Sequence, residues 1–524
     1  MISRRDFLRI SAMASAAALV NWQFPTSVRG EGAGEGYDVI VIGAGLGGLS
    51  CAALFALNGY KPLVIEKRDV PGGYATSFQR SVQQGDFTCE TSLHAITGNP
   101  LSQVLLQQLG VWDKLTFAPH SSSWTSIFPG LPFDFPQPPF ELLQPFLQPP
   151  IDLEALSAQL GGYLDLVFFN PNPNPIIGLG ICPSLVNSFP DEAEGLNGYM
   201  LCWRELLFET IKFYSAEQGM PDNIAQFPDE YPIWASMVWK KRHMKSKTLD
   251  DLFKEYKIKD PQLKAILGQT NPYYGLPSSE IPAWFYLMNT GLYHAFGSFY
   301  LQGNPDNNPD ELDLQGTSQD LSNLLVSSIT SPPTPPGVPF TFPGGEVLLN
   351  TEVTEIIIDG DGRAVGVRTQ GGTEYKATTV VSNASPPQTF DKLLPASAVP
   401  ATFTKTISRY QPSFSHFNVW LGLDLNQDKN DGFIEAYEKL GSNTALYSSY
   451  DHDRMFRAIQ KGDPEGSMIA AVAYDKLAGM SISHSPEAMP QLHFPCFVAT
   501  SHGKNLKRRI ETTTAIASRY STGM

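Results

Sequence analysis

Cysteine is scarce in this sequence, and its distribution excludes two common stabilising devices. The five cysteines are odd in number and lie far apart, and no Cys-x-x-Cys pair occurs; they are Cys51, Cys89, Cys182, Cys202 and Cys496. A disulfide framework needs paired cysteines, and a structural zinc site needs closely spaced ligands. The sequence therefore indicates neither, and we expect no metal in the functional site.

Positive charge is also in short supply. Lysine and arginine number 37 against 52 aspartates and glutamates, which gives a formal net charge of −15 at pH 7. Nucleic acids and anionic membrane surfaces attract basic proteins, so the sequence predicts neither as a partner. Motifs of other enzyme classes are missing too, because the sequence has no P-loop and no spacing typical of a Ser-His-Asp triad.

The sequence instead carries a strand, a glycine turn and a helix near its N-terminus. The apolar run Tyr37–Ile42 predicts a buried parallel strand and leads into a G-x-G-x-x-G motif at Gly43, Gly45 and Gly48. Such glycines permit a tight turn, close approach of the backbone to a pyrophosphate, and close packing of the following helix, here predicted at Leu49–Asn58. The expected cofactor contacts from this turn are Gly43, Ala44, Gly45, Leu46, Gly47 and Gly48.

A second short strand, Leu63–Ile65, ends in an acidic residue. Glu66 follows the glycines at about the twenty-residue spacing that lets a carboxylate accept a hydrogen bond from an adenosine ribose. The glycine pair Gly72 and Gly73 comes shortly afterwards and again allows the backbone to approach a bulky ligand. Strand, glycines, helix and acid in register predict a bound dinucleotide.

The stretch from Gly36 to Tyr74 resembles the FAD-binding N-terminus of the phytoene desaturase, carotenoid cis-trans isomerase and retinol saturase family. That resemblance implies FAD as the cofactor, with further contacts from Lys67, Gly72, Gly73 and Tyr74. It also implies the fold class. We expect an α/β protein with a Rossmann-like FAD-binding domain of the two-dinucleotide-domain flavoprotein type, interleaved with an α+β substrate-binding domain.

A second match to the same family lies far along the chain. Glu346–Ala377 predicts a β-hairpin and a third strand, and Val380–Ala384 predicts a separate short buried strand. These residues resemble the distant segment that, in the family, lays its backbone beside the adenine. The resemblance implies a backbone contact from Val353 and a cofactor contact from Asn383.

The residues between and after these matches are expected to form the substrate domain. Proline is dense over residues 112–190, which predicts loops and edge strands, and residues 140–180 are interpreted as an insertion. Helices are predicted at Asp191–Ser215 and Leu249–Lys257. Aromatic residues gather at Ile281–Tyr300, where they either line a tunnel for a long apolar ligand or fill a helical core.

His94 is the one candidate catalytic residue. It lies in Phe87–Gly98, a segment that in the resembled family runs beneath the flavin, and an imidazole titrates near neutral pH. His94 either faces the flavin ring as a proton donor or is a hydrogen-bonded histidine of the core. A second cluster, Asp451–Asp453, is interpreted as a solvated turn, because no further ligand lies at a metal-like spacing.

The first 36 residues are interpreted as a targeting segment. Arg4 and Arg5, followed by the alanine-rich run Ser11–Val20, are typical of a twin-arginine signal; an ordinary amphipathic helix is the alternative. The run is too short and too weakly apolar to span a membrane. We expect the twin-arginine translocation machinery as a partner and export to the periplasm or its equivalent. Cleavage of the signal, or its retention with membrane association, stays open.

The predicted order of domains follows from these segments. It is a signal and linker at 1–36, the FAD-binding domain at 37–110 and 315–395, the substrate domain at 111–314 and 396–505, and a C-terminal stub of the FAD-binding domain at 506–524. Thr514–Tyr520 resembles the start of a family segment that closes over the flavin, and the chain carries only a short form of it.

These features together predict an FAD-dependent oxidoreductase that acts on C=C bonds of a lipophilic polyene such as a carotenoid or retinoid. Desaturation, saturation and cis-trans isomerisation stay open, because in the resembled family the isomerase can use reduced flavin without net redox, so the residues do not show the direction of the reaction. Amine oxidases share the expected fold, and an aromatic cage beside the flavin would favour them. A non-catalytic lipid-binding protein or a truncated inactive homologue is the third interpretation.

Overall fold

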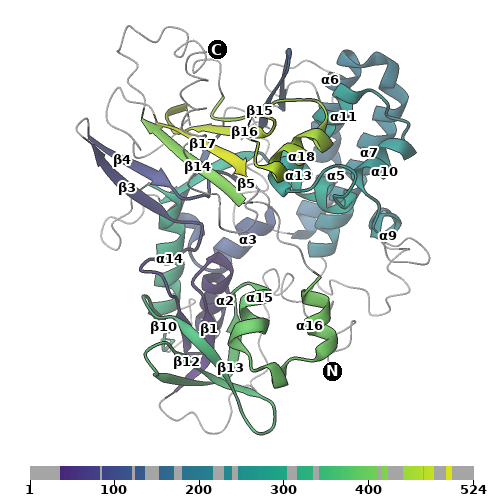
Figure 1. The fold of residues 1–524 in the computed structure, drawn as a ribbon. Helices are drawn as coiled ribbons and strands as arrows, with labels where there is room; N and C mark the ends of the chain where they lie inside the picture. The colour runs from purple at the N-terminus through teal and green to yellow at the C-terminus, as the bar shows by residue number, and fades with distance from the viewer. Residues whose placement is uncertain are drawn as a thin grey trace.

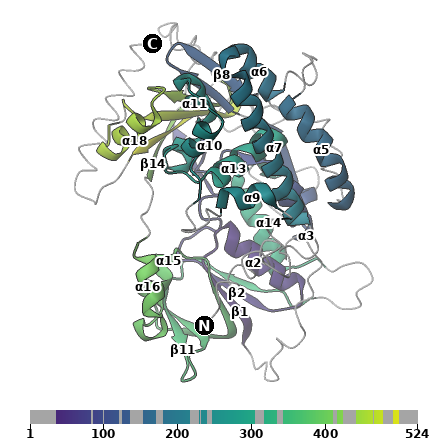
Figure 2. The same cartoon turned by 90° about the vertical axis from the view of Figure 1, so that its right-hand side faces the viewer.

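The structure is a computed structural model. It describes residues 36–82, 85–98, 100–120, 124–135, 153–169, 180–215, 229, 231–238, 246–303, 316–333, 342–409, 415–422, 441–463, 465–476 and 491–498. The first sheet lies at one end of the molecule, and the second sheet lies with most of the helices at the other (Figures 1 and 2). The predicted signal and the predicted C-terminal stub lie outside the described residues.

The first sheet has six strands. In spatial order they are β10 (Glu346–Leu348), β2 (Pro62–Ile65), β1 (Tyr37–Ile42), β13 (Glu374–Ser382), β12 (Ala364–Thr369) and β11 (Val353–Ile358). The first four run parallel, and β12 and β11 continue the sheet as antiparallel strands. All of β2 and most of β1 are buried, as expected of parallel strands covered on both faces.

β13 corrects the prediction of two separate strands ending at Ala377 and beginning at Val380. Its first half pairs antiparallel with β12, with Lys376 opposite Gly366, and its second half pairs parallel with β1, with Val381 opposite Val41. Each half thus has a different partner, which keeps the intervening backbone extended. A single strand therefore joins the antiparallel ribbon to the parallel core of the sheet.

Two helices cover the parallel part of this sheet. α2 (Leu46–Leu57) begins three residues before the predicted start, and α14 (Ser318–Thr330) packs beside it. The N-terminus of α14 is fixed by a capping box between Thr317 and Asp320. Alanines on the inner face of α2 allow close packing. The shared core includes Leu49, Ala52, Ala53, Val64, Leu321, Leu324 and Leu325.

The second sheet also has six strands. In spatial order they are β14 (Ser415–Gly422), β17 (Gln491–Val498), β16 (Met468–Ala473), β15 (Asn443–Tyr447), β7 (Trp124–Phe128) and β8 (Leu131–Phe135). Every neighbouring pair is antiparallel except β15 and β7. Two smaller sheets link the halves: β5 (Ile96–Thr97), β9 (Ser298–Gly303) and β6 (Leu115–Pro119), and β3 (Ser77–Val82) with β4 (Gly85–Glu90).

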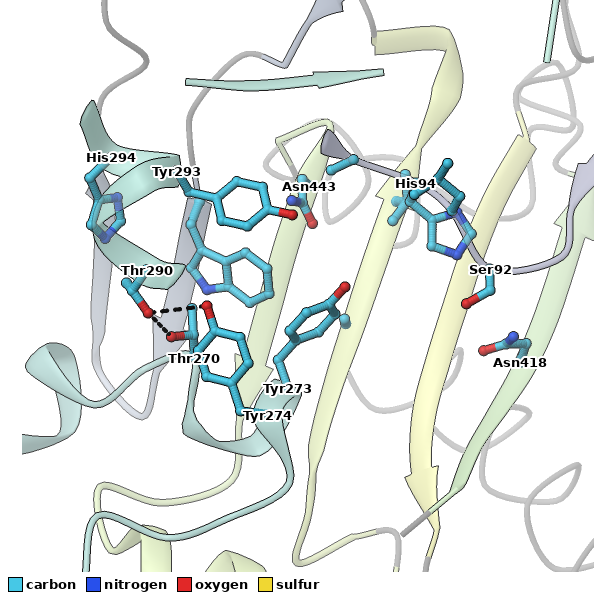
Figure 3. A pocket seen from close by; sticks show the side chains of 15 residues that line it. Ser92, His94, Thr270, Tyr273, Tyr274, Thr290, Tyr293, His294, Asn418 and Asn443 are labelled. Atoms are coloured by element: carbon cyan, nitrogen blue, oxygen red, sulfur yellow. Dashed lines mark hydrogen bonds between the residues drawn. The ribbon is translucent and has the colours of Figure 1, made fainter. Parts of the chain in front are cut away.

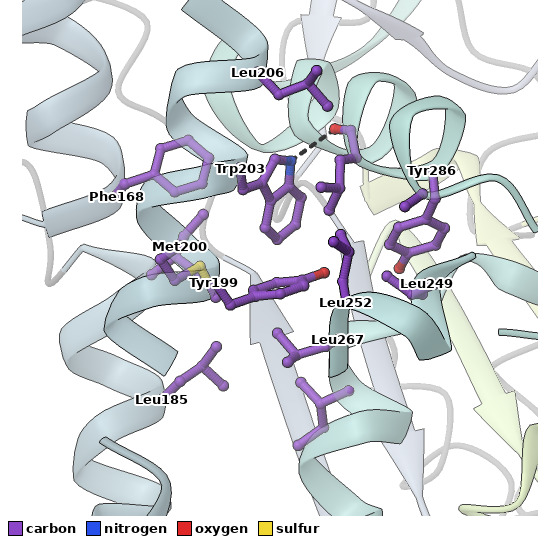
Figure 4. Close-up of a cluster of buried hydrophobic side chains, with 14 of the residues drawn as sticks. Phe168, Leu185, Tyr199, Met200, Trp203, Leu206, Leu249, Leu252, Leu267 and Tyr286 are labelled. Atoms are coloured by element: carbon purple, nitrogen blue, oxygen red, sulfur yellow. Dashed lines mark hydrogen bonds between the residues drawn. The ribbon is translucent and has the colours of Figure 1, made fainter. Parts of the chain in front are cut away.

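Helices pack against the second sheet and enclose the largest core. They are α5 (Leu153–Phe169), α6 (Ile181–Ser188), α7 (Ala193–Ser215), α9 (Pro232–Val238), α10 (Leu249–Glu255), α11 (Pro261–Leu267), α12 (Asn271–Tyr274), α13 (Ala283–Phe296) and α18 (His452–Lys461). Figure 4 shows Trp203 at the centre of this core, between Phe168 and Tyr199. The Trp203 indole N–H donates to the carbonyl of Leu287 at 2.7 Å, so its burial leaves that donor satisfied.

The remaining helical elements are short. They are α3 (Pro100–Gln108), α15 (Pro386–Gln388), α16 (Ala401–Ile407), the 3₁₀ turns Trp112–Lys114, Pro190–Glu192, Ala396–Ala398 and Tyr474–Lys476, and a π turn at Thr389–Leu393. Within the described ranges, every helix is too short or too polar to cross a bilayer. The predicted domain boundaries stay a prediction.

The described parts of the proline-rich region contain more helix and interior strand than predicted. It contributes α5 and α6 to the core, and β7 lies inside the second sheet, between β15 and β8. The reason is local, since β7 contains no proline, whereas Pro132 lies in β8 at the sheet edge, where a missing N–H is tolerated. The high proline content of residues 112–190 as a whole therefore did not reveal the short proline-free strand β7.

The predicted solvated turn at Asp451–Asp453 is wrong. Asp451 is the N-cap of α18, and its Oδ1 accepts from the Arg454 N–H at 2.9 Å. His452 is only 6% exposed and stacks on the ring of Tyr447. A helix cap with one buried ring, rather than a hydrated loop, explains the Asp-His-Asp sequence.

Candidate functional site

The glycine turn has the backbone that the motif requires. Gly43 has φ +96°, a conformation that favours glycine, and its N–H donates to the carbonyl of Ile65 at 2.8 Å. Gly45 caps α2, and no side chain accepts a hydrogen bond at this cap; the first helical turn carries no acidic residue. The first N–H groups of α2 therefore face outward with the positive end of the helix dipole, which suits a phosphate.

Gly48 sets the distance between α2 and the strand. A Cβ atom at this position would lie 2.1 Å from the Gly43 carbonyl oxygen, far inside van der Waals contact. The same atom on Gly47 would lie 3.0 Å from Oδ1 of Asn383, the end of an exposed side chain. Gly48 thus permits close packing of backbone on backbone, whereas Gly47 borders the open side of the turn.

The second glycine pair folds back onto the first turn. The Gly72 N–H donates to the Ala44 carbonyl at 2.7 Å, and Gly72 pairs with Gly45 in a parallel bridge. Gly72 and Gly73 have φ of +120° and +65°, so both positions favour glycine. Next to them Tyr74 is 78% exposed. Residues 43–48 and 72–74 therefore lie side by side beyond the carboxyl ends of β1 and β2.

Glu66 lies beside this turn and is only 8% exposed. Its Oε2 accepts from the Ala44 N–H at 2.8 Å and its Oε1 from the Arg68 N–H at 2.9 Å. Each carboxylate oxygen has a second lone pair, so these two bonds leave acceptor capacity for a ribose hydroxyl. The neighbouring Lys67 is exposed.

Val353 and Asn383 also lie close to the glycine turn. The Thr351 N–H donates to the Glu66 carbonyl at 2.9 Å, which holds the chain before Val353 along the end of β2. Val353 itself is 6% exposed and packs with Ile40 and Ile42 of β1 and with β2. The Asn383 N–H donates to the Ile42 carbonyl at 2.8 Å, and its side chain borders Gly45, Gly47 and Gly48.

The described residues hence fit a dinucleotide. The backbone of the turn packs too tightly for a Cβ on Gly48 or Gly72, the N-terminus of α2 has no side-chain cap, and a buried carboxylate stands at the end of β2. Thirteen of the fourteen residues predicted from the sequence surround this one place. His94 lies elsewhere.

His94 faces a separate cavity of about 90 Å³. The cavity lies between α12, α13 and the second sheet (Figure 3), and Ser92, Leu93, His94 and Ala95 form one wall. Tyr273 and Tyr274 of α12 and Tyr293 of α13 stand opposite. The remaining lining residues are Trp124, Thr270, Thr290, His294, Asn418, Asn443, Ala470 and Val472.

One short segment connects the two places. Thr76, which follows the second glycine pair, accepts from the Thr91 N–H at 2.8 Å through its carbonyl, and their hydroxyls lie 2.9 Å apart. Thr91 is followed directly by the cavity wall Ser92–Ala95. The opposite side of Thr91 is held by Asn418 of β14, which donates to its carbonyl at 3.1 Å. Thr91 therefore links the segment that follows the second glycine pair to the residues that line the cavity.

His94 has a hydrogen-bond partner that the sequence did not reveal. Its Nδ1 lies 2.5 Å from the hydroxyl of Tyr474, which is 1% exposed. Burial, and then the nearby Glu90, raises the pKa of Tyr474 well above its usual value, so this hydroxyl stays protonated near neutral pH. With Tyr474 donating, the neutral ring carries its hydrogen on Nε2.

His120 supports the same wall from behind. Its Nε2 donates to the His94 carbonyl at 3.2 Å, and its Nδ1 accepts from the Ser442 hydroxyl at 3.0 Å. Burial lowers the pKa of His120 to about 4, so the ring is neutral at physiological pH and can keep both of these hydrogen bonds. His94 is thus hydrogen-bonded within the fold and also lines a cavity, and its role as a proton donor to a flavin stays a prediction.

A fully buried carboxylate lies next to Tyr474. Glu90 ends β4 with no exposed surface, and it accepts from the Ser318 N–H at 2.9 Å, the Ser318 hydroxyl and the Tyr300 hydroxyl. Ser318 is the first residue of α14, so the helix dipole also favours negative charge here. The sequence gives no signal for this set, because Glu90 lies more than 200 residues before Tyr300 and Ser318.

The aromatic cluster predicted at Ile281–Tyr300 is divided between the two interpretations. Tyr286, Phe296, Phe299 and Tyr300 are at most 1% exposed and fill the core, whereas Tyr293 lines the cavity. Tyr273, Tyr274 and Asn418 were not predicted as site residues. Within the described ranges, no group of three or more potential metal ligands occurs.

Comparison with known proteins concerns the dinucleotide-binding turn and the chain as a whole. The model of the NAD(P)-binding Rossmann-like domain matches residues 41–109. Prolycopene isomerase 2 from an Oncidium hybrid cultivar is 25% identical over 406 residues, which are 74% of this chain and 55% of that protein. The 15-cis-phytoene desaturase of Narcissus pseudonarcissus is 30% identical over 220 residues, 40% of this chain and 32% of the desaturase. Over these residues the chain is similar to a prolycopene isomerase and to a phytoene desaturase.

The predicted resemblance and fold class are thereby confirmed. An oxidoreductase from Methanosarcina mazei matches in fold with a TM-score of 0.51 at 17% identity, over 91% of this chain and 83% of that one. The chain spans about half the length of the prolycopene isomerase that it matches. A model of twin-arginine translocation signals matches residues 1–20, so the predicted export signal is supported as well.

Proposed function

We propose that this chain is an FAD-dependent oxidoreductase that acts on C=C bonds of a lipophilic polyene such as a carotenoid or retinoid. The observation that carries the proposal is the link between the two places. The Thr91–Thr76 hydrogen bond ties the segment after the glycine turns to residues 92–95, which line the cavity, so a dinucleotide that reached this segment would lie close to a substrate held in the cavity. The names of the relatives, an isomerase and a desaturase of carotenoids, give the substrate class.

In this proposal the cofactor is held by the residues that surround the glycine turn. The N–H groups at the start of α2 would bind the pyrophosphate, and Glu66 would accept from the ribose. Gly72, Gly73, Tyr74 and the backbone at Val353 would supply further contacts to the cofactor. The flavin, when bound, supplies the transfer of hydride or electrons.

The chain's own contribution lies in the cavity. His94 carries its hydrogen on Nε2 while the Tyr474 hydroxyl donates to Nδ1, so the ring is held in one orientation within the cavity wall. His120 keeps the carbonyl of His94 satisfied and the segment in place. The aromatic side chains opposite exclude water from the bound polyene.

The targeting signal fits this assignment. The twin-arginine route carries folded proteins, which suits a chain that must acquire a dinucleotide before export. We propose that the folded protein is exported by this route to the periplasm or its equivalent and there associates with the membrane that dissolves its substrate.

The decisive experiment is the visible absorption spectrum of the chain purified from a host that supplies flavin. We expect flavin bands at about one equivalent that bleach on reduction, followed by anaerobic conversion of a polyene. A folded but colourless protein that takes up no added FAD would overturn the proposal and favour a lipid-binding role. Glu66→Ala should reduce flavin content, while Glu346→Ala, at an exposed site on the same sheet, should not.

One observation favours a second candidate. Three tyrosines and a tryptophan line the cavity, and aromatic faces of this kind can enclose a cationic amine beside a flavin, as in an amine oxidase. Hydrogen peroxide released on addition of primary amines, with no conversion of polyenes, would establish that activity instead.

A further inference from the structure

We propose that Asn418 contacts the ring of the bound flavin and accepts a hydrogen bond from the N5–H group, which the ring carries only when it is reduced. The inference rests on the proposed function and adds a cofactor contact outside the glycine turns. It derives from one buried oxygen atom of β14 and from the groups around it.

The amide of Asn418 has one fixed orientation. One end of it lies 3.1 Å from the Thr91 carbonyl oxygen. Because a carbonyl oxygen only accepts hydrogen bonds, the NH₂ group of Asn418 must be the end that faces it. The other end, Oδ1, is buried and has no hydrogen-bond partner among the described residues. Asn418 therefore presents an acceptor whose position is known and whose donor is not.

A buried acceptor of this kind costs free energy unless a donor satisfies it. Only an N–H or O–H group can do so. Asn418 lines the His94 cavity, and most of the surface of that cavity is apolar, which suits an apolar polyene. Such a substrate brings no N–H or O–H group, whereas the ring of a reduced flavin does. We therefore look for the donor in the cofactor.

Asn418 lies at the end of the cavity that is connected to the glycine turns. Its partner Thr91 donates through its N–H to the carbonyl of Thr76, which follows the second glycine pair. Figure 3 shows Asn418 close to Ser92, whereas His294 of α13 lies at the far side of the pocket. A cofactor that extends from the glycine turns along this segment would therefore meet Asn418 before it meets α13.

β14 holds this acceptor in place through two neighbouring contacts. Trp420 lies two residues after Asn418, so both side chains extend from the same face of the strand. The Trp420 indole N–H donates to the Glu90 carbonyl at 2.9 Å, and Asn418 donates to the next carbonyl along, that of Thr91. The oxygen is thus positioned before any ligand arrives, which lowers the cost of using it.

The flavin ring presents different groups at N5 in its two redox states. Oxidised N5 has a lone pair and no hydrogen, whereas reduced N5 carries an N–H. N5 is also the ring atom that exchanges hydrogen with a substrate, so it is the part of the ring that must border the substrate cavity. An acceptor in the wall of that cavity repels the lone pair of the oxidised ring and binds the N–H of the reduced ring. Asn418 would therefore favour the reduced flavin, because hydrogen bonds to ring nitrogens tune the cofactor.

The test measures the midpoint potential of the flavin in the purified full chain loaded with FAD, by titration against a redox dye. Asn418→Leu keeps a similar side-chain volume and removes the acceptor. We expect this variant to disfavour two-electron reduction about tenfold, the value of one neutral hydrogen bond, which lowers the potential by about 30 mV. The dissociation constant of oxidised FAD should change by less than about twofold, because oxidised N5 offers the acceptor no donor.

Trp420→Phe is the matched control. It removes the neighbouring hydrogen bond between β14 and the same segment and leaves Asn418 in place, so the potential should equal that of the parent chain. A second measurement needs no substitution and so does not depend on a variant that folds. In the parent chain, ¹⁵N NMR of FAD labelled at N5 should show a hydrogen-bonded N–H in the reduced state.

Three results would overturn the inference. One is an equal potential for Asn418→Leu and the parent chain, which would mean that Oδ1 meets water or nothing. Another is an equal drop for Trp420→Phe, which would mean that the position of the segment, and not the acceptor, sets the potential. The third is an NMR spectrum in which reduced N5 has no hydrogen bond. In each case the bound flavin would leave the proposed function standing, whereas a parent chain that binds no flavin would overturn both.

Discussion

Replacement of Gly48 by alanine tests whether close packing of α2 on the glycine turn stabilises the fold. The added Cβ would lie 2.1 Å from the Gly43 carbonyl oxygen, so helix and turn must separate by more than 1 Å to reach ordinary contact. Such overpacking typically costs about 1–3 kcal/mol, and the better helix propensity of alanine returns up to about 1 kcal/mol. We expect a net destabilisation of about 1–2 kcal/mol.

Gly47→Ala is the matched control one residue earlier. There the new Cβ approaches only the exposed end of the Asn383 side chain, which can rotate away, so we expect between no change and a stabilisation of about 1 kcal/mol. Thermal unfolding followed by circular dichroism, without added cofactor, should separate the two variants. The Gly48 variant should unfold at a midpoint about 1–2 °C lower. Equal midpoints for Gly48→Ala and the parent chain would refute the packing role.

Three further predictions concern the polar groups around the cavity. Glu90→Gln keeps the shape but replaces an acceptor by an amide against the donors from Ser318 and Tyr300, so urea unfolding should show a loss of about 2 kcal/mol; an unchanged midpoint would contradict this. Tyr474→Phe should cost about 1 kcal/mol and also shift the pH dependence of turnover, whereas a purely structural contact would change stability alone. Burial lowers the pKa of His120 to about 4, of His294 to about 3 and of His452 to about 4. Their unfolded values lie near 6.5, so the unfolded chain takes up protons that the folded chain cannot, and stability should fall as the pH drops from 6.5 toward 4. Unfolding midpoints measured across this pH range should show the loss of stability. His120→Gln should reduce the slope of the free energy of unfolding against pH, because up to one proton fewer is taken up on unfolding.

The dinucleotide turn could be predicted from the sequence because its signals are local. Gly43, Gly45 and Gly48 lie within six residues of β1, and Glu66 follows one helix later, so one strand, one turn and one helix bring them together. Asn383 was reached only through a family resemblance, since its position depends on the pairing of β13 with β1.

The cavity could not be predicted in the same way. Tyr474, Tyr273 and Asn418 come from three elements that no spacing in the sequence connects, and a lone tyrosine or asparagine carries no signal. His94 was identified, but the choice between its two roles depended on partners that only the fold supplies. The errors at β13 and Asp451 have a related cause. In both cases the local sequence pattern did not determine which groups would form hydrogen bonds with the backbone of the segment.

The order of the first sheet has a consequence for how the protein is made. β1 lies between β2 and β13, and Thr378 of β13 bonds to the backbone of Asp38 across a separation of 340 residues. At about 5–20 residues per second, the ribosome needs tens of seconds to deliver β13 after β1. During that interval the apolar edge of β1 stays open to wrong pairings. Chaperones that shield this edge should therefore raise the yield of protein competent for export.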